Sequence, residues 1–137
     1  MAFDAPTYSI VIPVYRSAET LPTLMQRLVD VFNRIGQSFE VVFVDDGSPD
    51  GAWEIVQELQ EQHPGVITAV QLMRNFGQHN AIMCGLRHAR GRFILTMDDD
   101  LQNPPEEIAK LLQAIETLKL DLVYGVPSIK QQIGRAH

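Results

Sequence analysis

Three aspartates in a row, Asp98 to Asp100, directly follow a largely apolar predicted strand over residues 92–97. Adjacent carboxylates repel one another, and desolvation beside a strand raises the cost of keeping them charged. A divalent cation removes this conflict, and carboxylate oxygens are ligands that suit Mg²⁺ or Mn²⁺. The cluster therefore predicts a metal site. A solvated acidic turn ahead of the next helix is an equally good interpretation of the cluster taken alone.

A second acidic turn, Asp45-Asp46-Gly47-Ser48, follows another apolar run. A carboxylate at this position could accept hydrogen bonds from a nucleobase or a ribose. The alternative is an Asx turn in which Ser48 or Asp50 caps the following helix. Two acidic turns that each end a strand favour the functional interpretation, because such turns meet at one edge of a parallel sheet.

A third polar segment, residues 74–80, precedes a further predicted helix. Arg74 could contact a phosphate there, since the first turn of a helix offers free backbone N–H groups to an anion. His79 is interpreted as a surface or capping residue. The chain has no Walker-type phosphate loop and no Rossmann glycine fingerprint, which argues against an ATPase or a dehydrogenase.

Strands and helices alternate along the chain, which predicts a parallel sheet covered on both faces, a three-layer α/β/α fold. Apolar, β-branched runs predict the strands and a period near 3.6 predicts the helices. Pro13-Val14-Tyr15 and both acidic turns then lie at the carboxyl ends of strands. The predicted strands cover 8–14, 39–44, 66–72, 92–97 and 121–124, and the predicted helices cover 19–35, 52–62, 78–89 and 105–118.

The composition fits one soluble domain, since 137 residues with 45% hydrophobic residues can bury a substantial core. A formal net charge of −6 argues against a nucleic-acid partner. A bound cation could still attract phosphate locally. The single cysteine, Cys84, excludes an internal disulfide and suits a reducing compartment. With neither a signal peptide nor an apolar span, the sequence predicts a cytoplasmic location.

Taken together, the motifs resemble glycosyltransferase family two, whose fold is called GT-A. Two further segments narrow the resemblance to the polyprenyl-phosphate (undecaprenyl or dolichyl phosphate) sugar transferases. The resemblance extends from about Tyr8 to Gly125. It implies the nucleotide-diphospho-sugar transferase fold, with this chain as its N-terminal part. The segments that carry the resemblance are 12–15, 44–48 and 97–100 for the family, and 74–79 and 100–106 for the subgroup.

Position by position, the resemblance implies a nucleotide pocket. Pro13 and Tyr15 would line it, while Val44 and Asp46 would contact the base and the ribose. The family usually has Asn-Glu after this tyrosine, and the glutamate contacts the nucleotide. This chain has Arg16-Ser17 instead, so that contact is missing and the base preference is open.

The same resemblance implies the catalytic and metal-binding residues. Asp98 and Asp99 would lie against the nucleotide and its diphosphate. Asp98, Asp100 and Gln102 would hold Mg²⁺ or Mn²⁺, and Asp98 and Asp100 are the predicted catalytic residues.

The implied reaction transfers a sugar, with inversion, from a nucleoside-diphosphate donor to polyprenyl phosphate. A UDP-sugar is the favoured donor. The alternatives are a family-two enzyme with a sugar or protein acceptor, a nucleotidyltransferase, and a fragment that binds nucleotide without turnover. A phosphate acceptor is anionic near neutral pH, so it would need no general base, unlike a sugar hydroxyl.

We expect residues 1–137 to form the nucleotide-sugar-binding portion of a GT-A domain truncated at its C-terminus. Such a portion would bind nucleotide but would not glycosylate the lipid alone. Its exposed sheet edge could promote homo-oligomers. A full-length form would lie at the cytoplasmic face of the membrane.

Overall fold

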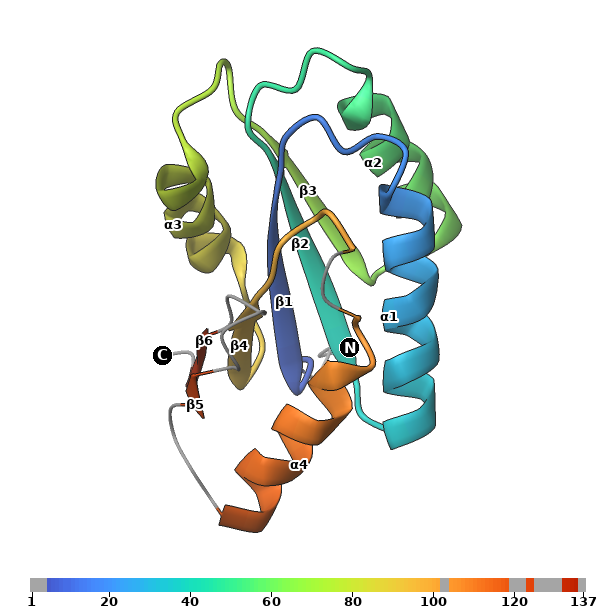
Figure 1. The fold of residues 1–137 in the computed structure, drawn as a ribbon, viewed down its shortest axis with the longest axis vertical. Coiled ribbons are helices and arrows are strands. Elements are labelled where there is room, and N and C mark those ends of the chain that lie inside the picture. The colour runs from blue at the N-terminus through green and yellow to red at the C-terminus, as the bar shows by residue number, and fades with distance from the viewer. Residues whose placement is uncertain (1–4, 102–103, 119–122, 125–131, 136–137) are drawn as a thin grey trace.

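The computed structural model describes residues 5–101, 104–118, 123–124 and 132–135, with side chains described as far as residue 114. Its six strands form one sheet in the order β3-β2-β1-β4-β6-β5 (Figure 1). Neighbouring strands from β3 to β4 are parallel, and β6 runs antiparallel to both β4 and β5. The strands are β1 Tyr8–Val14, β2 Phe39–Asp45, β3 Ile67–Gln71, β4 Phe93–Thr96, β5 Val123–Tyr124 and β6 Gln132–Arg135.

Four helices complete the three layers, and the predicted α/β class with a mostly parallel sheet is confirmed. Helices α1, α2 and α4 share a hydrophobic core with one face of the sheet, whereas α3 covers the other face (Figure 1). In the described residues, no helix is long and apolar enough to cross a membrane. The helices are α1 Leu21–Ile35, α2 Ala52–Gln62, α3 Gln78–His88 and α4 Glu107–Leu118.

Strand β1 lies at the centre of the parallel part, and all seven of its residues are buried. Side chains alternate between the two faces of a strand. Ile10 and Ile12 therefore enter the larger core beneath α1, α2 and α4, while Val11 enters the smaller core beneath α3. Burial on both faces explains why the strand is a nearly unbroken apolar run rather than an alternating one.

Helix α1 shows how local chemistry sets the ends of an element. Pro22 lies in its first turn, where a missing N–H costs no hydrogen bond. Gly36 ends the helix in the left-handed conformation, with φ of 70°, and its N–H donates to the carbonyl of Phe32. The predicted helix began two residues earlier, at Glu19, because the apolar period does not mark the first turn.

Helix α3 packs unusually close to the sheet. A Cβ added at Gly85 would lie 2.4 Å from Cγ1 of Val11 and 3.1 Å from Cγ2 of Val44, so a side chain there would displace the helix. Gly85 and Ala81 are both buried and form the side of α3 that faces the strands. Small residues on this side let the helix backbone approach the sheet.

A network of buried polar groups ties the loop after α3 to the amino ends of the strands. Glu40 is 1% exposed and accepts hydrogen bonds from the Oγ of Ser9 and the backbone N–H of Arg90, both at 2.5 Å. The Nε of Arg90 lies 3.2 Å from the other oxygen of Glu40. Ser9 in turn accepts a hydrogen bond from the N–H of Gly91 at 2.7 Å.

Strand β6 was not predicted. It pairs antiparallel with β4 on one side and with β5 on the other, so β5 does not lie directly beside β4 as a further parallel strand would. The part of the predicted 121–124 strand that the structure describes is Val123–Tyr124. The remaining predicted elements are present, with ends that shift by at most two residues.

Candidate functional site

A cavity of about 280 Å³ opens at the carboxyl ends of the parallel strands. It lies where the chain order changes direction in the sheet, because β1 pairs with β2 on one side and with β4 on the other. Such a switch point is where open α/β sheets bind ligands. The residues that line the cavity are Pro13, Val14, Tyr15, Asp46, Gln78, Asp98, Asp99 and Asp100.

Of the eight residues predicted to bind the nucleotide or the metal, six line this cavity. Val44 is fully buried in the smaller core beneath α3, so its side chain is not on the cavity wall. Gln102 lies outside the described residues. Gln78, which is the first residue of α3 and lines the cavity, was not among the predicted site residues. The sequence did hold a signal for this residue, because Gln78 begins a predicted helix directly after a polar segment.

Asp46 holds the loop that leads into α3. The side chain is 3% exposed, and its two oxygens accept hydrogen bonds from the backbone N–H groups of Phe76 at 2.8 Å and Gly77 at 3.1 Å. A carboxylate has about four lone-pair sites, so these two bonds leave capacity for a ligand in the cavity. These bonds are neither the predicted contact with a base or ribose nor part of a local Asx turn. They join two loops of the protein.

Gly47 permits the close approach of that loop. It has φ of 75°, and an added Cβ would lie 2.5 Å from the backbone nitrogen of Asn75 and 2.7 Å from the carbonyl carbon of Arg74. The predicted Asx turn is formed by Asp50, which accepts a hydrogen bond at 3.3 Å from the N–H of Ala52, the first residue of α2. Asp45 accepts another from the N–H of Ser48 at 3.2 Å. The Asp-Gly pair therefore docks the segment 74–77 against the end of β2.

Asp99 joins the turn after β4 to the loop after β1. Its Oδ2 accepts a hydrogen bond from the N–H of Tyr15 at 2.9 Å and another from the hydroxyl of Ser17. Its backbone carbonyl accepts from the hydroxyl of Thr20 at 2.7 Å. Burial raises the pKa of Asp99, while the bonds from Ser17 and Tyr15 lower it and the charge of Asp100 raises it further.

Asp98 is linked to the first residue of α3. The Nε2 of Gln78 donates to its Oδ1 at 2.9 Å, and both residues line the cavity. Asp46 fixes Gly77, the residue just before Gln78. The acidic ends of β2 and β4 are thus connected through the start of α3.

The charge around the cavity is strongly negative, since four of its eight described lining residues are aspartates and none is lysine or arginine. Oxygen ligands of this kind suit Mg²⁺ and Mn²⁺. Among the described residues, no group of three or more His, Cys, Asp or Glu side chains is arranged to hold a metal ion. Asp98 and Asp100 still fit Mg²⁺, which commonly takes one or two carboxylates and completes its shell with substrate phosphates and water.

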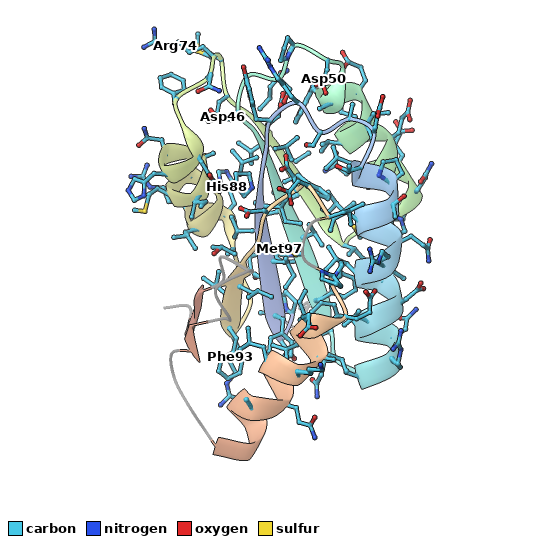
Figure 2. The ribbon with its side chains drawn as sticks, in the orientation of Figure 1. Asp46, Asp50, Arg74, His88, Phe93 and Met97 are labelled. Atoms are coloured by element: carbon cyan, nitrogen blue, oxygen red, sulfur yellow. The ribbon has the colours of Figure 1, made fainter. Side chains whose placement is uncertain are left out.

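Tyr15 and Phe76 present partly exposed aromatic rings in the two loops beside the cavity, at 39% and 43% exposure. The guanidinium of Arg16 lies 5.1 Å from the ring centroid of Tyr15, and that of Arg74 lies 4.8 Å from that of Phe76. Figure 2 shows Arg74 at the outer end of its loop, away from the sheet. Arg74 does not line the cavity, and its contact with a phosphate stays a prediction.

Comparison with protein families identifies a match over residues 9–135 to the model described as "Glycosyl transferase family 2". The undecaprenyl-phosphate 4-deoxy-4-formamido-L-arabinose transferase of Edwardsiella ictaluri is 44% identical over 108 residues, which are 79% of this chain and 33% of the relative. The protein of the same description from Pseudomonas savastanoi pv. phaseolicola is 45% identical over 123 residues, 90% of this chain and 36% of the relative. The chain thus spans about a third of the length of these relatives.

Solved structures show the same fold. A crystal structure of S. aureus TarS has a TM-score of 0.75 at 23% identity, covering 95% of this chain and 47% of that one. The Pyrobaculum calidifontis mannosyltransferase PcManGT, in complex with GDP-Man and Mn²⁺, has a TM-score of 0.73 at 25% identity, covering 90% of this chain and 36% of that one. TarS in complex with UDP-GlcNAc has a TM-score of 0.68 at 25% identity, covering 88% and 37%.

Proposed function

We propose, because this chain belongs to glycosyltransferase family 2, that the whole protein transfers a sugar from a nucleoside diphosphate to polyprenyl phosphate. Residues 1–137 would form the nucleotide-sugar-binding portion of its catalytic domain. The observation that carries the proposal is the gathering of Asp46 and Asp98 to Asp100 around one cavity at the switch point of the sheet. Such a cavity suits an anionic ligand that arrives with a divalent cation.

Different residues of this chain would bind different parts of the donor. Asp46 would accept hydrogen bonds from the ribose or the base through lone pairs that Phe76 and Gly77 leave free. The exposed ring of Tyr15 offers an apolar surface to a base, and Asp99 fixes the backbone beneath that ring. Asp98 and Asp100 would hold Mg²⁺ or Mn²⁺. When bound, such a cation neutralises negative charge on the departing diphosphate.

The names of the relatives support the lipid acceptor, since both are described as transferases that act on undecaprenyl phosphate. The solved neighbours support the donor class, because one holds GDP-Man with Mn²⁺ and another holds UDP-GlcNAc. The substitution of Arg16-Ser17 for the usual Asn-Glu removes one nucleotide contact of the family. A UDP-sugar remains the favoured donor to test.

Calorimetric titration of the chain with UDP tests the donor site. With Mn²⁺ present we expect an affinity at least about tenfold higher than with EDTA, equivalent to about 1.4 kcal/mol. Asp100→Asn should lose most of this gain. Glu58→Gln makes the same charge change on the exposed side of α2 and should keep it. Equal affinity in Mn²⁺ and in EDTA would contradict the metal assignment.

A second candidate function is nucleotide binding without turnover, which the length of the relatives favours for this chain taken alone. Incubation with a radiolabelled UDP-sugar and undecaprenyl phosphate in detergent separates the two. We expect lipid-linked product from a chain as long as the relatives and none from residues 1–137. Product from the 137-residue chain would show that the acceptor side is already complete.

A further inference from the structure

One continuous segment of this acidic protein carries positive charge and no negative charge. Residues 62–97 contain four arginines and not one aspartate or glutamate, so all 17 acidic residues of the chain lie outside them. The segment includes the loop after β3, helix α3 and β4. Six of its exposed residues form what we call the α3 face: Met73, Arg74, Phe76, His79, Met83 and Arg87.

The same face carries most of the exposed large hydrophobic side chains. Among the described residues, four large hydrophobic side chains are exposed, and three of them belong to the α3 face. Met73 is 97% exposed, Met83 44% and Phe76 43%. Exposed apolar side chains that cluster on one surface commonly mark a contact with a partner or a membrane.

Helical geometry places three residues of the face on the outer side of α3. His79, Met83 and Arg87 follow one another at intervals of four and form a single stripe. Ala81 and Gly85 are buried against the strands and lie about 200° around the helix from that stripe. Figure 1 shows α3 as the outermost layer on its side of the sheet, so the stripe faces away from the core.

The arginines of this face are not neutralised by the protein. Within the described residues, neither Arg74 nor Arg87 forms an ion pair. Arg90 pairs with Glu40 and is therefore not counted in the face. The nearby carboxylate of Asp46 is buried and bonded to backbone N–H groups. The face is therefore basic as well as apolar.

We propose that the α3 face docks on the surface of an anionic phospholipid bilayer. Arginines attract lipid phosphates, and Met and Phe side chains enter the boundary between headgroups and acyl chains, as in amphipathic helices that lie on membranes. The face adjoins the cavity, since Gln78 at the start of α3 lines it. The inference rests on the proposed function in one respect, because docking here would hold the donor site beside a lipid-borne acceptor.

Charge complementarity selects a lipid surface over other occupants of this face. An anionic bilayer presents many phosphates at once, and each arginine near it contributes about 1 kcal/mol, a factor of about five in binding. A second copy of the chain would instead need one carboxylate-rich patch of matching shape. We therefore treat self-association as the rival outcome of the experiment.

Sedimentation with lipid vesicles tests the proposal on the 137-residue chain. We expect binding to vesicles in which about a third of the phosphatidylcholine is replaced by phosphatidylglycerol, and none to pure phosphatidylcholine. Arg87→Glu should weaken binding at least about fivefold, and Met83→Ser should weaken it by about threefold or more. Added salt should weaken binding as well, because it screens the attraction. Arg34→Glu makes the same charge change at the exposed end of α1 and should change binding by less than about twofold.

Three results would overturn the proposal. The first is equal sedimentation with both kinds of vesicle, and the second is equal effects of Arg87→Glu and Arg34→Glu. The third is a concentration-dependent dimer that Met83→Ser disrupts, which would assign the face to a second copy. Circular dichroism confirms folding of each variant. Titration with UDP and Mn²⁺ keeps the two hypotheses apart, since Met83→Ser and Arg87→Glu should bind nucleotide as the unaltered chain does.

Discussion

Each end of β2 carries a buried carboxylate that accepts backbone hydrogen bonds from a loop beside α3. At the start of the strand, Glu40 accepts a backbone hydrogen bond from Arg90, just after α3. At its end, Asp46 accepts two such bonds from Phe76 and Gly77, just before α3. Both carboxylates are almost fully buried. Together they attach the loops on either side of α3 to one strand.

The difference lies in what else each carboxylate faces. Glu40 is enclosed by Ser9 and by the side chain of Arg90, so its oxygens are occupied by protein donors. Asp46 also lines the cavity and keeps lone pairs for a ligand. We infer that one end of the strand serves stability, whereas the other couples stability to binding. The predictions below test that contrast.

The largest effect is expected from Glu40→Ala. The change leaves the hydroxyl of Ser9 and the N–H of Arg90 without their acceptor in a buried place, which should lower the free energy of unfolding by about 3 kcal/mol. Urea denaturation measures it, with exposed Glu58→Ala as the control, expected within about 0.5 kcal/mol. UDP affinity of the folded variant should be unchanged. A selective loss of binding without a loss of stability would break the contrast.

Asp46→Ala should affect both properties. Binding of UDP with Mn²⁺ should weaken by roughly 1–3 kcal/mol through lost hydrogen bonds. Unfolding without ligand should also become easier, by about 1–2 kcal/mol, because Phe76 and Gly77 lose their acceptor. Asp45→Asn is the matched control, since this buried neighbour bonds to Ser48 and does not line the cavity. Equal losses of binding in both variants would remove Asp46 from the ligand site.

The smallest effect is expected from a carboxylate that is not buried. Arg27 on α1 donates two side-chain hydrogen bonds to Glu106, just before α4, and these lower the pKa of Glu106. Both side chains are about one-third exposed, so solvent screening should limit the contribution to about 1 kcal/mol or less. A lowered pKa means that this stability is present above the ordinary value of 4.5 and is lost as pH falls through the folded pKa.

Denaturation of the unaltered chain and of Glu106→Gln between about pH 7 and pH 3 measures the contribution of this ion pair to the free energy of unfolding. The two stabilities should converge as the solution becomes acidic. Glu107→Gln, whose cation Lys110 lies 3.8 Å away on the same helix, should show a change of less than about 0.5 kcal/mol. A difference that persists unchanged at low pH would show that packing, not charge, links α1 to α4.

Local patterns predicted the elements well where the pattern itself decides the structure. The nearly unbroken apolar run over 8–14 predicted β1, and the apolar period over 52–62 predicted α2, both with the observed bounds. Strand β6 was missed because its four residues, Gln-Ile-Gly-Arg, hold one apolar residue and become a strand through pairing with β4 and β5. The local sequence does not indicate such pairing.

The position of the site could be predicted from the sequence, but the hydrogen bonds within it could not. Asp46 and Asp98 meet because the carboxyl ends of parallel strands share one edge, which the order of elements already implies. The bonds of Asp46 to Phe76 and of Asp99 to Tyr15 join residues 30 and 84 positions apart. No spacing rule connects positions so distant, so their roles as links between loops emerged from the structure alone.

The close packing of α3 against β1 and β2 has a consequence for local unfolding of the protein. Gly85 brings the helix backbone against Val11 and Val44, and the buried carboxylates hold its flanking loops. A helix attached at its middle and at both ends has little freedom to separate from the strands by itself. We expect its amide protons to exchange with solvent at the slow rate of the central strands, as one cooperative unit, and not at the faster rate of an independent surface helix.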